Sequence, residues 1–293
     1  KQGYDLNVGG WKHGGPWFGK KYFSPYGNPR LSNGPDGEHL PNRLATETCR
    51  FIETNKDKPF FAMLSFYSVH TPLIARKDLT RKYQARKKER GLEAKWGQEH
   101  NRKVRLVQEH AVYGGMVEAM DYHLGRLISH LEQTDQYTNT LFIVTSDNGP
   151  EPSNPVALAG PLFGWWLRLN GYHTDIERLG ERGSFNFLGT DNASAAASPL
   201  AFYKFYAGEG VMRVPLVISG PSVVAPSRLS HAFTYVKDLA ATVLDIANIE
   251  HPGSRYQGRD IEPLTGKTLR PILQARTEHI RDDSEVTLSL IHI

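Results

Sequence analysis

The sequence LFIVTSDNG, from Leu141 to Gly149, runs from apolar into polar residues. Its first four residues predict a short buried β-strand. Ligands of open α/β sheets gather beyond the carboxyl ends of the strands, so Asp147 and Asn148 could offer two hard oxygen donors there. The same pair also suits a simple Asx turn, and spacing alone does not separate the two interpretations.

Helical and strand patterns alternate around this stretch. Apolar residues recur at helical spacing in Asn42–Thr54, Val104–Gln133 and Tyr235–Ile249. Short apolar runs at Phe60–Phe66 and Val214–Ser219 predict further strands. The alternation predicts an α/β fold, with a mostly parallel sheet flanked by helices that bury their apolar stripes against it.

Two long segments carry no regular pattern. Lys1–Glu38 is rich in Gly, Pro, Asn and aromatic residues, and we expect an ordered loop region there. Gly149–Met212 is too long for an ordinary connection, so it is expected to form a wall of an active site.

The composition excludes several classes of protein. The 293 residues, 39% hydrophobic and 23% charged, are typical of a soluble globular chain. There is no apolar run of about 20 residues, so no transmembrane segment is expected. Cys49 is the only cysteine, which excludes an internal disulfide. The net charge of +4 is concentrated in Arg76–Arg105, where we favour a solvated helical face over an anion-binding groove. Aromatic interleaving of the kind that binds nucleic acid is not seen.

Two further motifs carry candidate site residues. His70 follows the expected strand at Phe60–Phe66, and a turn at Thr71-Pro72 could hold its imidazole toward a ligand. Lys204 lies between aromatic residues ahead of the expected strand at Val214–Ser219, where its ammonium could pair with a tetrahedral dianion. Taken singly, each is as well explained by a structural histidine or a surface lysine.

Taken in order, the motifs resemble the sulfatase family of the alkaline phosphatase superfamily. The resemblance covers nearly everything from Gly3 to Leu273. It rests on these blocks: Lys58-Pro59-Phe60-Phe61 with His70-Thr71-Pro72; Met116 to Asp121 with Gly125-Arg126; Asn139-Thr140-Leu141 running into Ser146 to Gly149; Lys204 to Glu209; Arg213 to Leu216; Lys237 to Leu244; and Gly266 to Leu273.

This resemblance implies a site and a chemistry. Sulfatases hold calcium or a similar divalent ion such as magnesium with two early aspartates and a later Asp-Asn pair, to which Asp147 and Asn148 correspond. His70 is similar to the histidine that helps the leaving group, and Lys204 to the lysine that binds a sulfate oxygen. The family nucleophile is a formylglycine made in a C/S-x-P-x-R motif, which does not occur here. Cys49 lacks the required proline and arginine, so we reject it as the nucleophile.

The resemblance also sets expectations for the boundaries of the chain. We expect residues 1–275 to be the C-terminal two-thirds of a sulfatase catalytic domain, incomplete at its N-terminus and at its C-terminus, and residues 276–293 to be an unassigned tail. One departure is Val211, where the family most often has a glycine, because a β-branched residue disfavours a positive φ.

Function is expected to be hydrolysis of sulfate monoesters, aryl or carbohydrate, with a sulfated glycan among the possible substrates. Two alternatives remain: an inactive fragment or pseudoenzyme that binds sulfated ligands, and a phosphonate or phosphate monoester hydrolase. Asn148 favours a hard ion such as calcium, and so the sulfatase. A periplasmic or extracellular location follows from the resemblance, with the sequon Asn192-Ala193-Ser194 as slight support. The sequence does not indicate an oligomeric state.

Overall fold

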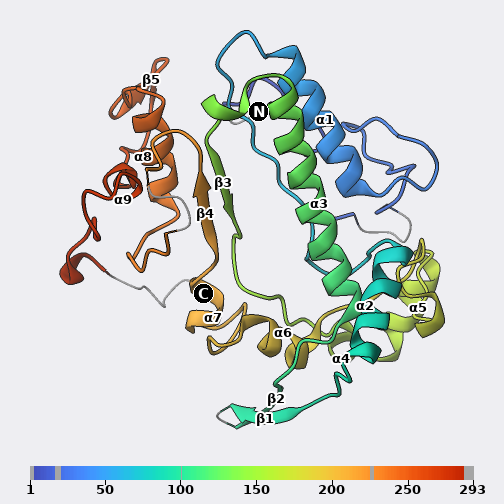
Figure 1. Cartoon of the computed structure of the whole chain (residues 1–293). Coiled ribbons are helices and arrows are strands. Elements are labelled where there is room, and N and C mark those ends of the chain that lie inside the picture. Colours follow the sequence, from blue (N-terminus) through green and yellow to red (C-terminus); the bar gives the residue numbers. More distant parts are fainter. Residues whose placement is uncertain (1–2, 17–20, 100, 225–227, 287–293) are drawn as a thin grey trace. The chain divides into compact units, whose positions relative to one another are not determined.

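The computed structural model describes residues 3–16, 21–99, 101–224 and 228–286 (Figure 1). The chain divides into two units. Unit 1 consists of Lys1–Tyr137 and Ser146–Val214, and unit 2 consists of Thr138–Thr145 and Pro215–Ile293. Residues 287–293, which belong to the expected tail, lie outside the described residues.

Three helices form the frame of unit 1. They are α1 (Leu40–Thr54), α2 (Lys77–Glu89) and α3 (Ala111–Gln133). Pro41 stands in the first turn of α1, and the His110 side chain caps α3 by accepting a hydrogen bond from the Tyr113 backbone. Val112, Met116, Leu127 and Leu131 of the stripe predicted for α3 are buried, and the helix packs against α1 and α2 within unit 1 (Figure 1).

The predicted strand at Phe60–Phe66 is wrong. Residues 59–67 have no assigned secondary structure, and Phe61 and Met63 are 59% and 67% exposed. A strand requires a hydrogen-bonded neighbour, and no described segment pairs with this backbone. An apolar run predicts only that a strand could form.

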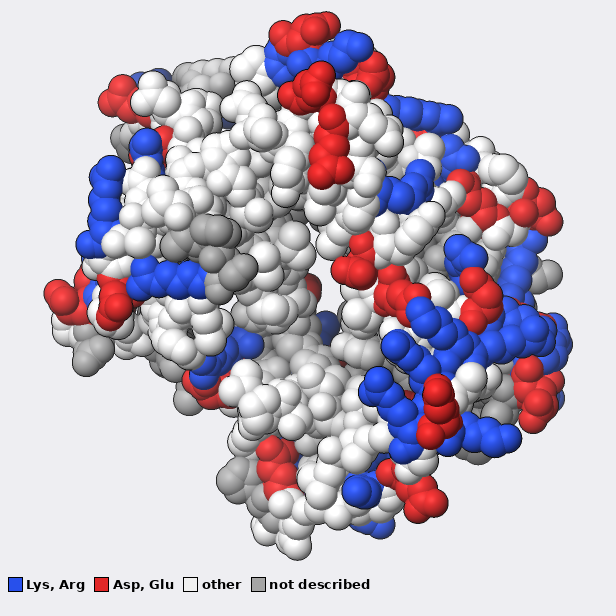
Figure 2. Space-filling model, viewed as in Figure 1, with Lys and Arg blue, Asp and Glu red and all other residues white. Residues whose placement is uncertain are grey.

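The basic stretch divides into two structures. Its first part forms α2, whose Lys and Arg side chains gather on one face of the molecule, as the solvated-face interpretation expects (Figure 2). The second part forms an antiparallel hairpin, β1 (Trp96–Glu99) and β2 (Arg102–Arg105). The helix predicted from Val104 therefore begins only at Ala111.

The remaining elements of unit 1 are short and lie between Pro155 and Met212. They are α4 (Pro155–Ala159), α5 (Pro161–Leu169), η2 (Ile176–Arg178), α6 (Gly189–Ala197) and α7 (Glu209–Met212). The core of the unit also takes buried aromatic side chains from the opening loop, namely Tyr22, Phe23 and Tyr26. This loop is therefore ordered by packing, as expected for its described residues.

Unit 2 is built on one strand pair. After η1 (Tyr137–Asn139), β3 (Phe142–Thr145) pairs antiparallel with β4 (Leu216–Ser219), and Thr145 stands opposite Leu216. The chain therefore leaves β3 and enters β4 at the same end of the pair, as antiparallel strands require. All strand pairs among the described residues are antiparallel, so the parallel sheet of the prediction is not seen in them.

The rest of unit 2 surrounds a buried ion pair. The elements are α8 (Lys237–Ile246), β5 (Arg255–Tyr256), β6 (Arg259–Asp260), α9 (Arg270–Leu273) and η3 (Asp283–Glu285). The side chains of Asp238 and Arg281 are 0% and 4% exposed and pair through both carboxylate oxygens. Asp238 also accepts hydrogen bonds from the backbone N–H groups of Tyr235 (2.7 Å) and Lys267 (2.9 Å). Arg281, from the expected tail, is thus part of this core.

Two buried histidines are expected to destabilise the protein in acid. Burial lowers the pKa of His39 and of His123 from 6.5 to about 4. His39 Nδ1 is buried with no hydrogen-bond partner among the described residues, and His123 Nδ1 accepts from Arg126 (3.2 Å), so a second ring proton would find no acceptor at either nitrogen.

Between pH 6.5 and 4 the unfolded chain therefore binds more protons than the folded chain, and stability falls as the pH falls. Urea unfolding measured from pH 7 to 4.5 should show a loss of a few kcal/mol. The loss should be smaller in His123→Gln. A free energy of unfolding that stays constant across this window would contradict the assignment.

Candidate functional site

The residues that follow β3 are held by backbone contacts with α7. Gly149 N–H donates to the Val211 carbonyl (3.0 Å), and Gly210 N–H donates to the Ala201 carbonyl (2.7 Å). A Cβ on Gly149 would lie 1.9 Å from the Gly210 oxygen. The close approach of these backbones requires glycine at position 149. Val211 lies within helix α7, so its replacement of a glycine introduces no positive φ.

The His70 loop is anchored to the same segment. Thr71 Oγ1 donates to Glu151 Oε2 (2.7 Å), and both residues are buried. His70 Nδ1 bonds the Thr71 carbonyl (2.8 Å); because a carbonyl only accepts, Nδ1 carries the hydrogen, and a proton would be exchanged at Nε2. The Ser68–Val69 and Thr71–Pro72 peptide bonds are cis. The imidazole itself is exposed.

Glu151 is a buried carboxylate that the motif analysis missed. Burial by itself would raise its pKa, but hydrogen bonds from Ser153 and Thr71, together with the nearby His70, hold the pKa below its ordinary value. The ionised form of Glu151 therefore links the two loops. The sequence feature that could have pointed to Glu151 is its position between Pro150 and Pro152, three residues after Asn148.

The Lys204 loop meets the segment as well. Lys204 N–H donates to the Pro150 carbonyl (3.1 Å). Phe202, two residues before Lys204, and Phe205, the residue after it, have φ values of 70° and 78°. A left-handed conformation at a bulky residue costs about 1–3 kcal/mol, and such strain concentrates at functional sites. The Lys204 ammonium lies 5.6 Å from the centre of the Phe205 ring.

Asp147 and Asn148 stand in turn conformation, and Asp147 is exposed. Asp147 Oδ1 accepts a hydrogen bond from the N–H of the next residue, Asn148 (3.0 Å), whereas an Asx turn is closed by the N–H two residues on, and Gly149 N–H donates to Val211. Their side-chain oxygens suit a hard cation. Among the described residues, no group of three or more His, Cys, Asp or Glu could hold a metal ion, so this pair would supply two ligands of a larger set.

Three motifs far apart in sequence are thus brought together within unit 1. Hydrogen bonds join residues 149–151 to the His70 loop on one side and to the Lys204 loop on the other. The structure places the backbones of all four predicted residues in or beside this junction. A second residue missed from the sequence is Arg102, which lies 4.7 Å from the ring centres of Phe202 and Tyr206, beside Lys204.

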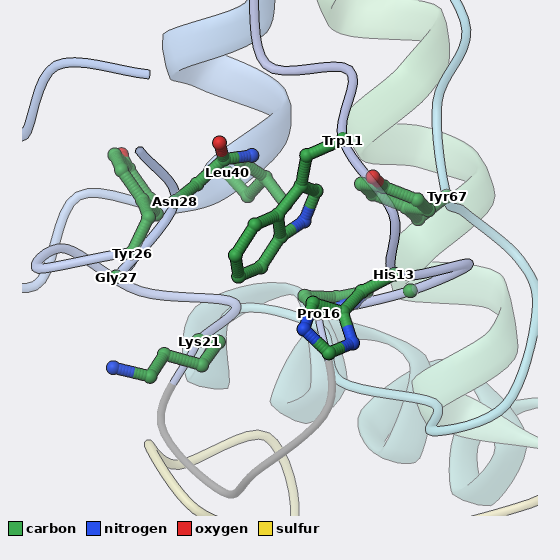
Figure 3. A pocket seen from close by; sticks show the side chains of 10 residues that line it. Trp11, His13, Pro16, Lys21, Tyr26, Gly27, Asn28, Leu40 and Tyr67 are labelled. Atoms are coloured by element: carbon green, nitrogen blue, oxygen red, sulfur yellow. The ribbon is translucent and has the colours of Figure 1, made fainter. Parts of the chain in front are cut away.

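A small cavity lies near the segment that precedes His70. Its volume is about 50 Å³, and its walls include Trp11, His13 and Tyr67 (Figure 3). The ring centres of Trp11 and His13 lie 4.3 Å apart, and the Lys21 side chain points away from the indole (Figure 3). Drug-sized ligands need about 300 Å³ or more, so this cavity is too small for a substrate.

Comparison with known proteins identifies the family. The family model described as Sulfatase matches residues 1–249. The chain belongs to the sulfatase family. Among curated sulfatases, it is 31% identical over 245 residues to an uncharacterized sulfatase of Schizosaccharomyces pombe, covering 72% of the chain and 43% of that relative. It is 25% identical over 275 residues to the arylsulfatase of Klebsiella aerogenes, covering 83% and 58%.

Solved structures agree on the fold of this sulfatase. The crystal structure of Ps i-CgsB in complex with k-i-k-neocarrahexaose matches with a TM-score of 0.50 and 22% identity, over 82% of the chain and 39% of that structure. These matches confirm the α/β class expected from the sequence. The match spans about half the length of the curated relatives named above, 43% of the first and 58% of the second.

Proposed function

We propose that the protein to which this chain belongs hydrolyses sulfate monoesters at the junction of the Asp147, His70 and Lys204 segments. The supporting observation is that Thr71–Glu151 and Lys204–Pro150 hydrogen bonds join these three segments within one unit. A cation ligand pair, an imidazole and an ammonium are the groups needed to neutralise an anionic ester as its bond breaks.

In this proposal Asp147 and Asn148 hold calcium, or magnesium in its place. Their carboxylate and amide oxygens match the preference of these ions for hard donors. A bound cation would polarise a sulfate oxygen and offset its charge. Lys204 would bind another sulfate oxygen, and its strained neighbours Phe202 and Phe205 would fix the direction of the loop.

His70 would donate a proton to the ester oxygen that leaves. With Nδ1 engaged by the Thr71 carbonyl, proton transfer would use Nε2. Glu151, buried and ionised, would hold the loop that carries His70 in place through its hydrogen bond from Thr71.

The nucleophile in this proposal is a formylglycine outside these 293 residues, which contain no C/S-x-P-x-R motif. Cys49 does not take its place. It lies in α1, and burial raises the pKa of its thiol, which disfavours the reactive thiolate. We therefore expect this chain to show no turnover of 4-nitrophenyl sulfate, and measurable hydrolysis would contradict the proposed nucleophile.

Aryl and carbohydrate sulfates both remain candidate substrates, since the relatives include an arylsulfatase and a structure with a bound carrahexaose. The proposed location is periplasmic or extracellular. The sequon does not support it, because Asn192 lies inside α6 and its side-chain nitrogen donates to the Leu188 carbonyl (3.1 Å). No helix in the described ranges is long and apolar enough to span a bilayer.

The test uses the longest polypeptide that the gene encodes, produced with a formylglycine-generating enzyme. Steady-state hydrolysis of 4-nitrophenyl sulfate should lose about 10²-fold or more in kcat/KM in His70→Ala and in Lys204→Ala. The exposed residues His231 and Lys88 supply matched controls, and alanine at either should leave kcat/KM unchanged. Equal activity of the site and control variants would refute the assignment, as would an upstream sequence that lacks the nucleophile motif.

A further inference from the structure

The β1–β2 hairpin presents two chemically different faces. Its register pairs Trp96 with Arg105, Gln98 with Lys103, and Glu99 with Arg102. Side chains alternate along each strand, so Trp96, Gln98, Lys103 and Arg105 share one face. The other face carries Glu99, Arg102 and Val104. We call these the outer face and the inner face.

The inner face is fastened to the Lys204 loop. Arg102 Nη1 donates to the Tyr203 hydroxyl (2.8 Å), and its guanidinium lies 4.7–5.3 Å from the ring centres of Phe202, Tyr203 and Tyr206. Glu99 accepts a hydrogen bond from Phe202 N–H (3.3 Å). These contacts fix the hairpin to the loop that carries Lys204.

The outer face combines an aromatic ring with cations. The Trp96 side chain is 39% exposed, the Lys103 ammonium lies 4.3 Å from its ring centre, and the Arg105 guanidinium lies 4.7 Å from it. Arg105 is paired with Glu109. Lys103 has no ion pair within the described part of the chain, so its positive charge is not offset.

We propose that this outer face is a binding subsite for a sulfated oligosaccharide, on the hairpin whose inner face holds the Lys204 loop. The identity of the ligand rests on the function proposed above. Trp96 gives a flat apolar surface on which the C–H face of a sugar ring can stack. Lys103 can bind a sulfate on that ring, and Gln98 can hydrogen bond its hydroxyls.

The hairpin's attachment explains why the subsite would serve the reaction. Arg102 and Glu99 fix the hairpin that presents Trp96 to the backbone around Lys204, so the subsite and the Lys204 loop are held as one rigid piece. A monosulfated aryl ester has one sulfate and no sugar ring, so it cannot engage Lys204 and the Trp96–Lys103 face together. The inference therefore favours a polymeric or oligomeric sulfated carbohydrate over a small aryl sulfate.

Binding is tested by isothermal titration of the 293-residue chain with a heparin hexasaccharide. Trp96→Ala and Lys103→Gln are each expected to weaken the affinity about tenfold. The control is Lys88→Gln on α2, which removes the same charge from an exposed position and should change Kd less than twofold. Trp96→Phe, which keeps an aromatic ring, should retain most of the affinity.

Three results would overturn the subsite: equal affinity of the hairpin variants and the parent chain, an equal loss in Lys88→Gln, or tighter binding of a single-stranded oligodeoxythymidylate, which would indicate a nucleic-acid surface. Maltohexaose, which is uncharged, should not bind. Amide exchange of the β1–β2 hydrogen bonds verifies that each variant keeps its hairpin, and if one loses it, the other variant carries the test.

Failure of the subsite and failure of the proposed function are separable. The double variant Asp147→Ala with Asn148→Ala should abolish sulfate ester hydrolysis in the longest polypeptide, yet leave hexasaccharide affinity at the hairpin unchanged. If Trp96→Ala leaves sulfate ester hydrolysis unchanged, the subsite is rejected and the proposed function is not.

Discussion

Asp238→Asn should destabilise unit 2 by about 3–5 kcal/mol, because it leaves the Arg281 guanidinium buried without a counter-charge. Burial alone would raise the pKa of Asp238, but hydrogen bonds from Arg281 and from the Lys267 and Tyr235 backbones hold that pKa below 3.8. The ion pair therefore stabilises the fold at pH values above the unfolded pKa of 3.8, and this contribution is lost as the pH falls through the folded pKa. Urea unfolding at pH 7 measures the effect.

The double variant Asp238→Asn with Arg281→Met separates charge from packing. Removing both charges should restore part of the stability, since no unpaired charge remains. Glu53→Gln is the control, because it breaks an ion pair with Lys56 that is exposed to solvent and should leave the free energy of unfolding almost unchanged. A loss in Asp238→Asn as small as in this control would mean that Arg281 is not buried in solution.

Gly149→Ala should destabilise unit 1 by about 1–3 kcal/mol or more. The added methyl would lie 1.9 Å from the Gly210 oxygen and 2.8 Å from the Val211 Cα, and backbone atoms cannot rotate out of its way. The chain after β3 would have to shift, and Asp147 with it. Amide exchange should show lost protection of the residue 149 N–H, which bonds the Val211 carbonyl.

Gly125→Ala and Gly164→Ala are matched controls for this substitution. Both glycines are helical, and a Cβ at either would contact nothing within 4 Å. Alanine there should be neutral or stabilise by up to about 1 kcal/mol. If Gly149→Ala behaves as they do, the close approach of residues 149 and 210 does not exist.

The helices were predictable from the sequence to a degree that the strands were not. A helix satisfies its backbone locally, so the spacing of Val112, Met116 and Leu127 was enough to place α3. A strand depends on a partner elsewhere in the chain. Phe60–Phe66 has the composition of a strand and no described neighbour, whereas the charged sequence at Trp96–Arg105 pairs with itself and was missed.

The candidate site shows the same division. Motif order led to Asp147, Asn148, His70 and Lys204, whose segments meet in unit 1. Glu151 and Arg102 could not be recognised from motifs, because their roles depend on contacts with distant residues. Glu151 accepts a hydrogen bond from a threonine 80 residues earlier in the chain, and Arg102 packs on three aromatic rings. Burial of a charge cannot be deduced from composition alone.

The pairing of Thr145 with Leu216 has a consequence for how such proteins diversify. Directly opposed residues of antiparallel strands lie about 5 Å apart, so the segment between them begins and ends at nearly the same point. Insertions or deletions within residues 152–200 leave the strand register intact, since closing a longer loop costs only a few tenths of a kcal/mol. The exposed parts of this segment can therefore change in length, while its buried core residues, such as Leu167, Phe185 and Leu188, and the residues at its two ends stay in place.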